Sequence, residues 1–334
     1  MRPAGHLGSW MPAAGALAAV WLAVASSTTG GASAVQNGHA TLDQPPSIQV
    51  ERIIATRADL GRGRWLRRLT GRSDPRLFVR PYGVAWDGDS LVVTDPGLGR
   101  VLSIDERGRV LSSAADLFES PIGVASCAAG LLVSDSRRGR VGILDRQLRL
   151  RRWLADGLLR PTGVACVDEH LFVVETGRHR VLSFDPEMRV FGRRGEAEGE
   201  FNFPTVLSAD NEALWVGDTL NFRVQGLDPS SGESLATLGR LGDASGDMPR
   251  IKGIAIDPAG RLWISDAHLE QIAVYRRDGV FLTTLGTAGS EPGELSFPAG
   301  LCAHPDGRVA VADSLNRRVQ ILRVREQKAA GETR

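Results

Sequence analysis

Acidic residues recur along this chain, each at the end of a short apolar run, and most are followed five residues later by an arginine. The pairs are Asp95 and Arg100, Asp135 and Arg140, Glu175 and Arg180, Asp218 and Arg223, and Asp313 and Arg318. An acid that ends one strand and an arginine that opens the next lie across a turn, where they can pair while the carboxylate accepts backbone N–H groups. A catalytic group is needed once, whereas a turn clamp is needed in every copy. The repetition therefore favours a structural role.

A sixth acid, Asp266, departs from this pattern, because Gln271 stands where the arginine would be. His268 and Glu270 lie in the same turn, so three potential metal ligands cluster there. One interpretation is ordinary drift in an exposed turn. The other is a local polar or metal-binding site formed by Asp266, His268 and Glu270. The sequence leaves both open.

The acids belong to a repeat that organises the chain after residue 48. Each copy has a Pro-x-Gly start, a short apolar strand, a turn, a second strand ending in the acid, and a third strand opened by Arg-Val, as in RPYGVAWDGDSLVVTDPGLGRVLSID from Arg80. Successive acids are 40, 40, 43, 48 and 47 residues apart. This period is typical of a four-stranded propeller blade, and no copy has an apolar stripe of helical period. We therefore predict an all-β, six-bladed β-propeller with four-stranded blades.

The two ends of the repeat array predict how the ring closes. The sixth copy has a third strand over residues 318–324 but no fourth strand, and a polar tail follows over 325–334. Residues 48–55 (IQVERIIA) form a lone strand ahead of the first copy. We expect this strand to complete the last blade, which removes two unpaired edges. Residues 61–70 then lead back to the first blade as a short amphipathic helix. The propeller domain is expected to span 48–324.

The first 34 residues are different in kind. Residues 13–24 form an apolar run after Arg2, and Ala32-Ser33-Ala34 fits a cleavage site for a signal peptide. The run is shorter than the roughly 20 residues that span a bilayer. We expect a signal peptide over 1–34, a linker over 35–47, and export to the periplasm or outside the cell, with no membrane span after cleavage. An uncleaved anchor is the alternative.

Three cysteines, Cys127, Cys166 and Cys302, fall in predicted innermost strands. An odd number allows at most one bridge. Three small buried thiols and a Cys127–Cys166 disulfide both fit the sequence, and the spacings do not resemble a zinc site.

The repeat resembles the NHL-repeat family of β-propellers. The strongest matches are VGDTLNFRVQ at 216–225 and VADSLNRRVQ at 311–320, with the lead-ins GEFNFP from Gly199 and GELSFP from Gly293. The likeness covers 48–324 and also extends to secreted bacterial six-bladed propellers of unassigned role. It implies the fold strongly and the function weakly, because the family includes lyases, receptor-sensor domains and modules that bind RNA or protein.

Propellers commonly bind ligands at the mouth of the central channel, where each blade contributes one residue. The middle residues of the Pro-x-Gly starts vary, unlike the clamps, and two of the prolines follow an arginine. The candidate ligand-binding residues are Arg80, Tyr82, Arg160, Thr162, Thr205 and Lys252. A basic mouth suits an anionic ligand or an acidic segment of a partner. A solvated face without a ligand is the alternative.

These observations predict an exported, monomeric binding scaffold that recognises another protein or an anionic ligand, with no cofactor and no catalytic residue. A metal-dependent lyase or lactonase-like hydrolase is the first alternative. It is disfavoured because His179 and His268 are expected on one face and His170 and His304 on the other, and zinc usually needs three protein ligands. An RNA-binding module is the second alternative, and the formal net charge of +1 argues against nucleic acid.

Overall fold

The structure, a computed structural model, describes residues 47–60, 75–185 and 187–325. The predicted signal peptide, most of the linker, the amphipathic helix over 61–70 and nearly all of the polar tail lie outside these residues. Every described residue belongs to one compact unit that spans 40–334.

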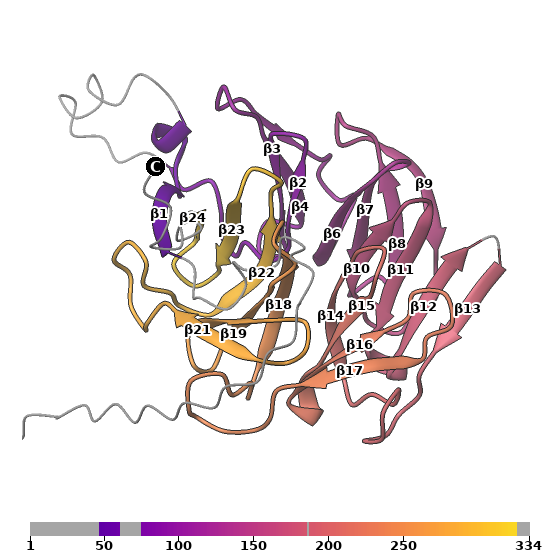
Figure 1. The fold of residues 1–334 in the computed structure, drawn as a ribbon. Helices are drawn as coiled ribbons and strands as arrows, with labels where there is room; N and C mark the ends of the chain where they lie inside the picture. The colour runs from indigo at the N-terminus through magenta and orange to yellow at the C-terminus, as the bar shows by residue number, and fades with distance from the viewer. Residues whose placement is uncertain (1–46, 61–74, 186, 326–334) are drawn as a thin grey trace, which may run out of the picture. The chain divides into compact units, whose positions relative to one another are not determined.

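This unit contains six antiparallel sheets of four strands each (Figure 1). The first three blades are formed by β2 (Val84–Asp87), β3 (Ser90–Asp95), β4 (Arg100–Ile104) and β5 (Val110–Ser112); by β6 (Pro121–Cys127), β7 (Gly130–Asp135), β8 (Arg140–Leu144) and β9 (Leu150–Ala155); and by β10 (Pro161–Val167), β11 (His170–Glu175), β12 (Arg180–Asp185) and β13 (Glu187–Phe191).

The fourth and fifth blades are formed by β14 (Pro204–Ala209), β15 (Leu214–Asp218), β16 (Arg223–Leu227) and β17 (Ser234–Leu238), and by β18 (Ile251–Ile256), β19 (Leu262–Asp266), β20 (Gln271–Tyr275) and β21 (Phe281–Leu285). The sixth blade contains β22 (Pro298–Ala303), β23 (Arg308–Asp313), β24 (Arg318–Arg325) and β1 (Ser47–Ile54). Short 3-10 helices occupy Arg57–Leu60 (η1), Thr176–Arg178 (η2) and Thr219–Asn221 (η3). The prediction of six four-stranded blades is confirmed.

The N-terminal strand closes the ring as the sequence predicts. Strand β1 pairs antiparallel with β24, from Ser47 opposite Arg325 to Ile54 opposite Val319. Just after β1, the carboxylate of Asp59 accepts hydrogen bonds from the backbone N–H groups of Ala55 and Thr56 at 2.9 and 2.7 Å. This capping ends the strand and turns the chain into η1.

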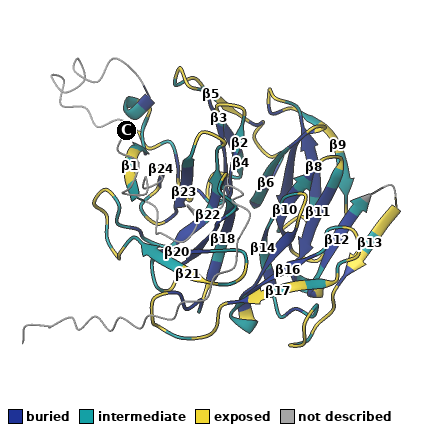
Figure 2. Ribbon diagram, in the orientation of Figure 1, coloured by how far each residue is buried: buried dark blue, intermediate teal, exposed yellow. Residues whose placement is uncertain are grey.

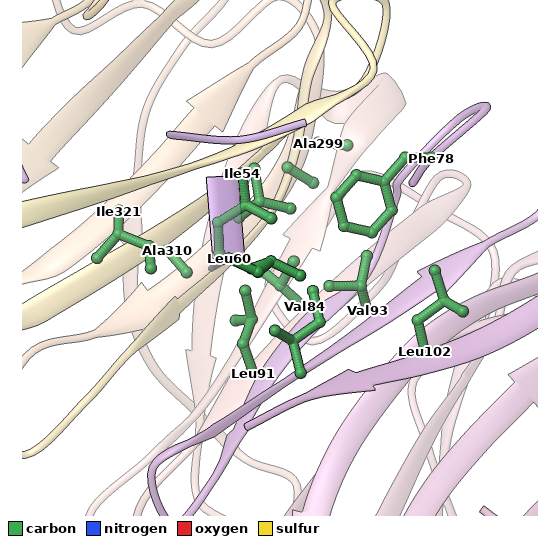
Figure 3. Packing of buried hydrophobic residues seen from close by; sticks show 13 residues of the cluster. Ile54, Leu60, Phe78, Val84, Leu91, Val93, Leu102, Ala299, Ala310 and Ile321 are labelled. Atoms are coloured by element: carbon green, nitrogen blue, oxygen red, sulfur yellow. The ribbon is translucent and has the colours of Figure 1, made fainter. Parts of the chain in front are cut away.

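The core lies between neighbouring blades. The second and third strands of each blade are mostly buried, whereas the outer fourth strands are largely exposed or half-buried (Figure 2). At the junction of the sixth and first blades, Ile54 and Leu60 join a buried cluster with Val84 and Leu91 from the first blade and Ile321 from β24 (Figure 3). Burial of this apolar surface stabilises the junction that β1 completes.

The first strands of successive blades contact one another around the channel, and the glycine of Pro-x-Gly makes this approach possible. A Cβ atom at Gly83 would lie 2.3 Å from the carbonyl oxygen of Ile122 in the next blade, and one at Gly123 would lie 2.2 Å from that of Thr162. Only a residue without a side chain fits there. The fourth blade has Val206 at this position, and Gly217, its partner across the sheet, leaves the space that the valine occupies.

Candidate ligand site at the channel mouth

The repeated acids are all buried at the ends of their second strands. Each accepts a hydrogen bond from the backbone N–H of the segment leading into its own first strand, for example Val79 to Asp95 at 2.8 Å and Asn202 to Asp218 at 2.6 Å. The acid therefore ties the start of the first strand to the end of the second at the upper end of each blade, which we define as the end carrying the acid.

The predicted acid–arginine pairs form in three blades. Arginine Nε lies 2.7 Å from the carboxylate in Glu175–Arg180, 2.9 Å in Asp218–Arg223 and 2.6 Å in Asp313–Arg318. Burial is the main cause of the raised pKa of Asp218, and the bonds from Asn202, Asn221 and Arg223 oppose it.

The predicted pairing is wrong in the first two blades. Arg100 donates to Ser112 at 3.4 Å, and the Arg140 Nε lies 3.2 Å from a carboxylate oxygen of Asp156. The reason is that backbone N–H groups already occupy both carboxylate oxygens of Asp95 and of Asp135. Each paired acid instead has one oxygen that accepts no backbone N–H, and this oxygen binds the arginine, together with Asn and Gln side chains at Asp218 and Asp313.

The turn of the fifth blade does not gather its three candidate metal ligands around one point. Both oxygens of Asp266 accept backbone N–H groups, those of Arg250, His268 and Leu269. The side chain of His268 is exposed, and Glu270 accepts a hydrogen bond from Ser296 at 3.4 Å. Within the described part of the chain, no three His, Cys, Asp or Glu side chains are placed to hold a metal ion.

The histidines are also separated. His179 is buried at the upper end, where its Nδ1 accepts the backbone N–H of Phe203 at 3.1 Å. At the lower end, His304 lies between Asp306, at 2.8 Å, and the ring of Trp86. His170 begins β11, also at the lower end.

Side chains from all six first strands line an open cavity in the channel, with an empty volume of about 410 Å³ that includes open solvent. Tyr82, Thr205 and Lys252, three of the predicted mouth residues, line it together with the glycines and aliphatic residues beside them. Thr162 does not line it. This residue is buried, and its hydroxyl is 2.7 Å from that of Thr176, which donates to the carbonyl of Pro204. Thr162 therefore lies outside the cavity, in a chain of hydrogen bonds that links the third and fourth blades.

Arginines precede the first strands of alternate blades: Arg80 in the first, Arg160 in the third and Arg250 in the fifth. All three side chains are exposed, and none forms a hydrogen bond or ion pair with another described residue. Arg250 instead lies over the ring of Phe297, with its Cζ 5.5 Å from the centroid. The sequence prediction missed Arg250 because Ile251 replaces the proline of that copy. Aligning the copies on Gly253 would have placed Arg250 beside Arg80 and Arg160.

These cations act on the two titratable groups in the cavity. Burial, reinforced by Arg250 and Arg160, lowers the pKa of Lys252 to about 8, and Asp266 opposes the shift. Burial also raises the pKa of Tyr82, while Arg160, Arg80 and Arg250 oppose that change. The mouth therefore has positive potential, which Asp266 offsets only in part.

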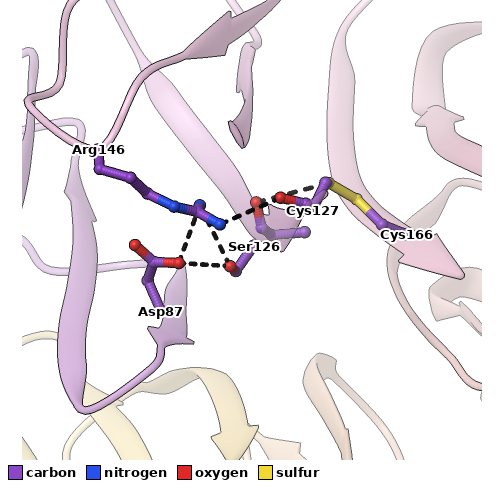
Figure 4. The surroundings of a disulfide bond; sticks show 6 residues. Asp87, Ser126, Cys127, Arg146 and Cys166 are labelled. Carbon is purple, nitrogen blue, oxygen red and sulfur yellow. Dashed lines mark hydrogen bonds and ion pairs between the residues drawn. A yellow bond between two sulfur atoms is a disulfide. The ribbon is translucent and has the colours of Figure 1, made fainter. Parts of the chain in front are cut away.

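At the lower end, a disulfide joins the first strands of the second and third blades. Cys127 and Cys166 are bonded, with Cα atoms 5.7 Å apart (Figure 4). Beside it, Arg146 forms an ion pair with Asp87 of the first blade at 2.8 Å and donates to the carbonyl of Cys127 at 3.3 Å. Cys302 is a free thiol whose pKa is raised by burial. Of the two arrangements that the sequence allows, the structure has the disulfide.

No helix in residues 47–60, 75–185 or 187–325 has the length and hydrophobicity needed to span a membrane.

Comparison with known proteins supports the fold. The family model described as NHL repeat matches residues 295–322. No curated protein sequence matches the chain. Among solved structures, a protein of unknown function from Bacteroides thetaiotaomicron is similar at a TM-score of 0.64 and 14% identity, over 84% of this chain and 76% of the other.

Two enzymes have similar folds. A virginiamycin B lyase from Staphylococcus aureus aligns at a TM-score of 0.56 and 12% identity, over 83% of this chain and 99% of the other. A gluconolactonase from Xanthomonas campestris aligns at a TM-score of 0.57 and 16% identity, over 84% of this chain and 95% of the other. At such identities the likeness concerns architecture alone. The chain is therefore a six-bladed β-propeller that carries an NHL repeat in its sixth blade.

Proposed function

We propose that the protein is an exported binding scaffold that recognises an anionic ligand at the mouth of its central channel. The observation that carries the proposal is the set of three exposed arginines on alternate blades, Arg80, Arg160 and Arg250. They do not line the cavity, but the charges of all three act on Tyr82 within it, and those of Arg160 and Arg250 act on Lys252 as well. None of their side chains forms an ion pair with another described residue. Other arginines at the same end, such as Arg138 and Arg240, are engaged with a carbonyl or a carboxylate. Unpaired guanidinium groups with positive neighbours are suited to carboxylate or phosphate oxygens, which they bind in a bidentate manner.

The cavity is small, which favours a small anionic group over a large ligand. The group can be a free small molecule or an acidic side chain of a partner protein. Exposed leucines at the same end of the blades, Leu98, Leu220 and Leu315, give a polypeptide apolar surface to contact.

Two observations support export. The first is the predicted signal peptide over 1–34. The second is the Cys127–Cys166 disulfide, since such bonds persist mainly in oxidising compartments.

Calorimetric titration at low ionic strength, with citrate and a hexaglutamate peptide as probes, tests the binding proposal. The double variant Arg160→Gln/Arg250→Gln should bind citrate at least about tenfold more weakly than the wild type, because charge-assisted hydrogen bonds are lost. The matched control is Arg107→Gln, which removes an exposed arginine from the turn between β4 and β5. Equal citrate affinity in the double variant and the wild type contradicts the proposal. Tighter binding of the peptide than of citrate indicates a polypeptide ligand.

A further inference from the structure

Lys252 is the only lysine in the described part of the chain, and its surroundings differ from those of a surface lysine. The side chain is half-buried in the channel cavity and forms no hydrogen bond or ion pair with another described residue. Asp266, the carboxylate that opposes the lowering of the Lys252 pKa, already accepts three backbone N–H groups. The ammonium group therefore has no dedicated counter-ion there.

The walls of the cavity favour the neutral amine. Val84, Val124, Val164 and Ile254 line it with aliphatic surface, which solvates an ammonium group poorly. Arg250 and Arg160 add like charge. With a pKa of about 8, Lys252 is neutral far more often near neutral pH than an ordinary lysine is. A desolvated lysine next to other cations is the usual setting of amines that attack carbonyl carbons.

Tyr82 and Thr205 share the cavity with this amine. The Thr205 hydroxyl lies 2.6 Å from that of Thr219, which leaves the Tyr82 phenol as the hydroxyl donor. Burial raises the pKa of Tyr82, so this phenol is protonated at neutral pH. A phenol O–H can donate a hydrogen bond to a carbonyl oxygen, and the arginines above can hold a carboxylate on the same small molecule. The combination of an amine, a hydroxyl donor and carboxylate anchors specifies a ligand more closely than positive charge alone.

We propose that Lys252 captures a small oxo acid, a carboxylate that also carries an aldehyde or ketone group, as a covalent imine in the channel. This inference rests on the proposed function, which accounts for binding of the carboxylate, and adds recognition of the carbonyl group. The neutral Nζ attacks the carbonyl carbon and forms the C–N bond, while the carbonyl oxygen takes up a proton. The resulting carbinolamine then loses water, with the nitrogen giving up its remaining proton, to leave the C=N bond. The reaction consumes one amine and one carbonyl and releases one water, and it needs no redox partner.

Reductive trapping tests the inference on the full chain. The protein is incubated with glyoxylate and sodium cyanoborohydride, which reduces an imine to a stable amine, and the modified lysine is located by peptide mass spectrometry. We expect one carboxymethyl group on Lys252, forming at least about tenfold faster than on Lys328, the other lysine of the sequence. The variant Lys252→Arg should lose this adduct, and the matched control Lys328→Arg should keep it. Propionaldehyde, which lacks the carboxylate, should label Lys252 more slowly, and citrate should compete with glyoxylate.

Each outcome decides a different part of the inference. Labelling of Lys252 no faster than Lys328, with citrate binding intact, overturns the imine and leaves the anion-binding function standing. Equal labelling by propionaldehyde and glyoxylate overturns the requirement for a carboxylate. Loss of both citrate binding and selective labelling removes the proposed function as well.

Discussion

At the scale of the residue, Lys252 is held where its own charge is unfavourable. Burial and the neighbouring Arg250 and Arg160 all favour the neutral amine, and Asp266 only partly opposes them. A group of this kind binds protons less tightly in the folded protein than in the unfolded chain. Linkage then requires the folded protein to be destabilised wherever the amine is charged.

Replacement of Lys252 by methionine should therefore stabilise the protein near pH 7. The pKa rises from about 8 in the folded state towards 10.5 on unfolding, so the wild type gains stability as the pH increases between these values. We expect Lys252→Met to be more stable than the wild type by about 2–3 kcal/mol at pH 7, and this advantage to shrink by pH 10. Urea unfolding of both proteins at the two pH values measures the difference. A constant difference across this range would show that Lys252 titrates normally.

The residues that repeat were easier to predict from the sequence than those that do not. The position of each acid at the end of its second strand follows from the pattern, and so does the nearby arginine. The partner of each arginine does not follow, because it depends on how many backbone N–H groups reach the carboxylate, as Asp95 and Asp218 illustrate. The pattern did not predict Arg250, because Ile251 replaces the proline that follows the equivalent residue Arg80 in the first copy.

At the scale of the element, β1 is the strand on which the closed ring depends. It pairs with β24 over its length, and its last residue, Ile54, is fully buried in the cluster shared with the first blade. The sequence could predict this pairing because a missing fourth strand and a lone N-terminal strand are complementary. It could not predict that the chain turns from β1 into η1, because this turn depends on the capping of Ala55 and Thr56 by Asp59.

Removal of β1 should destabilise the propeller strongly. A chain that starts at residue 55 loses the burial of Ile54 and exposes the edge of β24, and we expect a loss of about 3–5 kcal/mol in the free energy of unfolding. A chain that starts at residue 46 keeps β1 and is the matched control. If the shorter chain does not fold, Ile54→Ala should show a loss of about 2–4 kcal/mol by urea unfolding. Equal stability of the variants and the control would refute the role of β1.

At the scale of the whole molecule, the same ring provides both the scaffold and the site. Glycines bring the first strands close enough to line a channel, and residues at their upper ends converge on its mouth. The period of the repeat was enough to predict this architecture. It was not enough to predict the ligand, because Tyr82 and Lys252 each occur once, and no repetition reveals their role. The propeller fold that the chain shares with other proteins says little about its ligand, since this fold accommodates enzymes and binding proteins alike.

The disulfide between the second and third blades gives a further prediction at this scale. It closes a loop with a sequence separation of 39 residues, for which restriction of the unfolded chain is worth about 3–4 kcal/mol. The variant Cys127→Ala/Cys166→Ala should lose about this much stability and become insensitive to dithiothreitol, whereas Cys302→Ala should respond to dithiothreitol like the wild type.

The redox state in the native cell links this bond to localisation. Because a reducing cytosol keeps most thiols free, an oxidised pair in the native cell would support the exported location that we propose. Thiol labelling of the protein from native cells, after denaturation under conditions that block exchange, should modify Cys302 alone. Labelling of all three cysteines would place the chain in a reducing compartment. The proposal of export would then fail, although the channel-mouth site, which lies at the other end of the blades, would be unaffected.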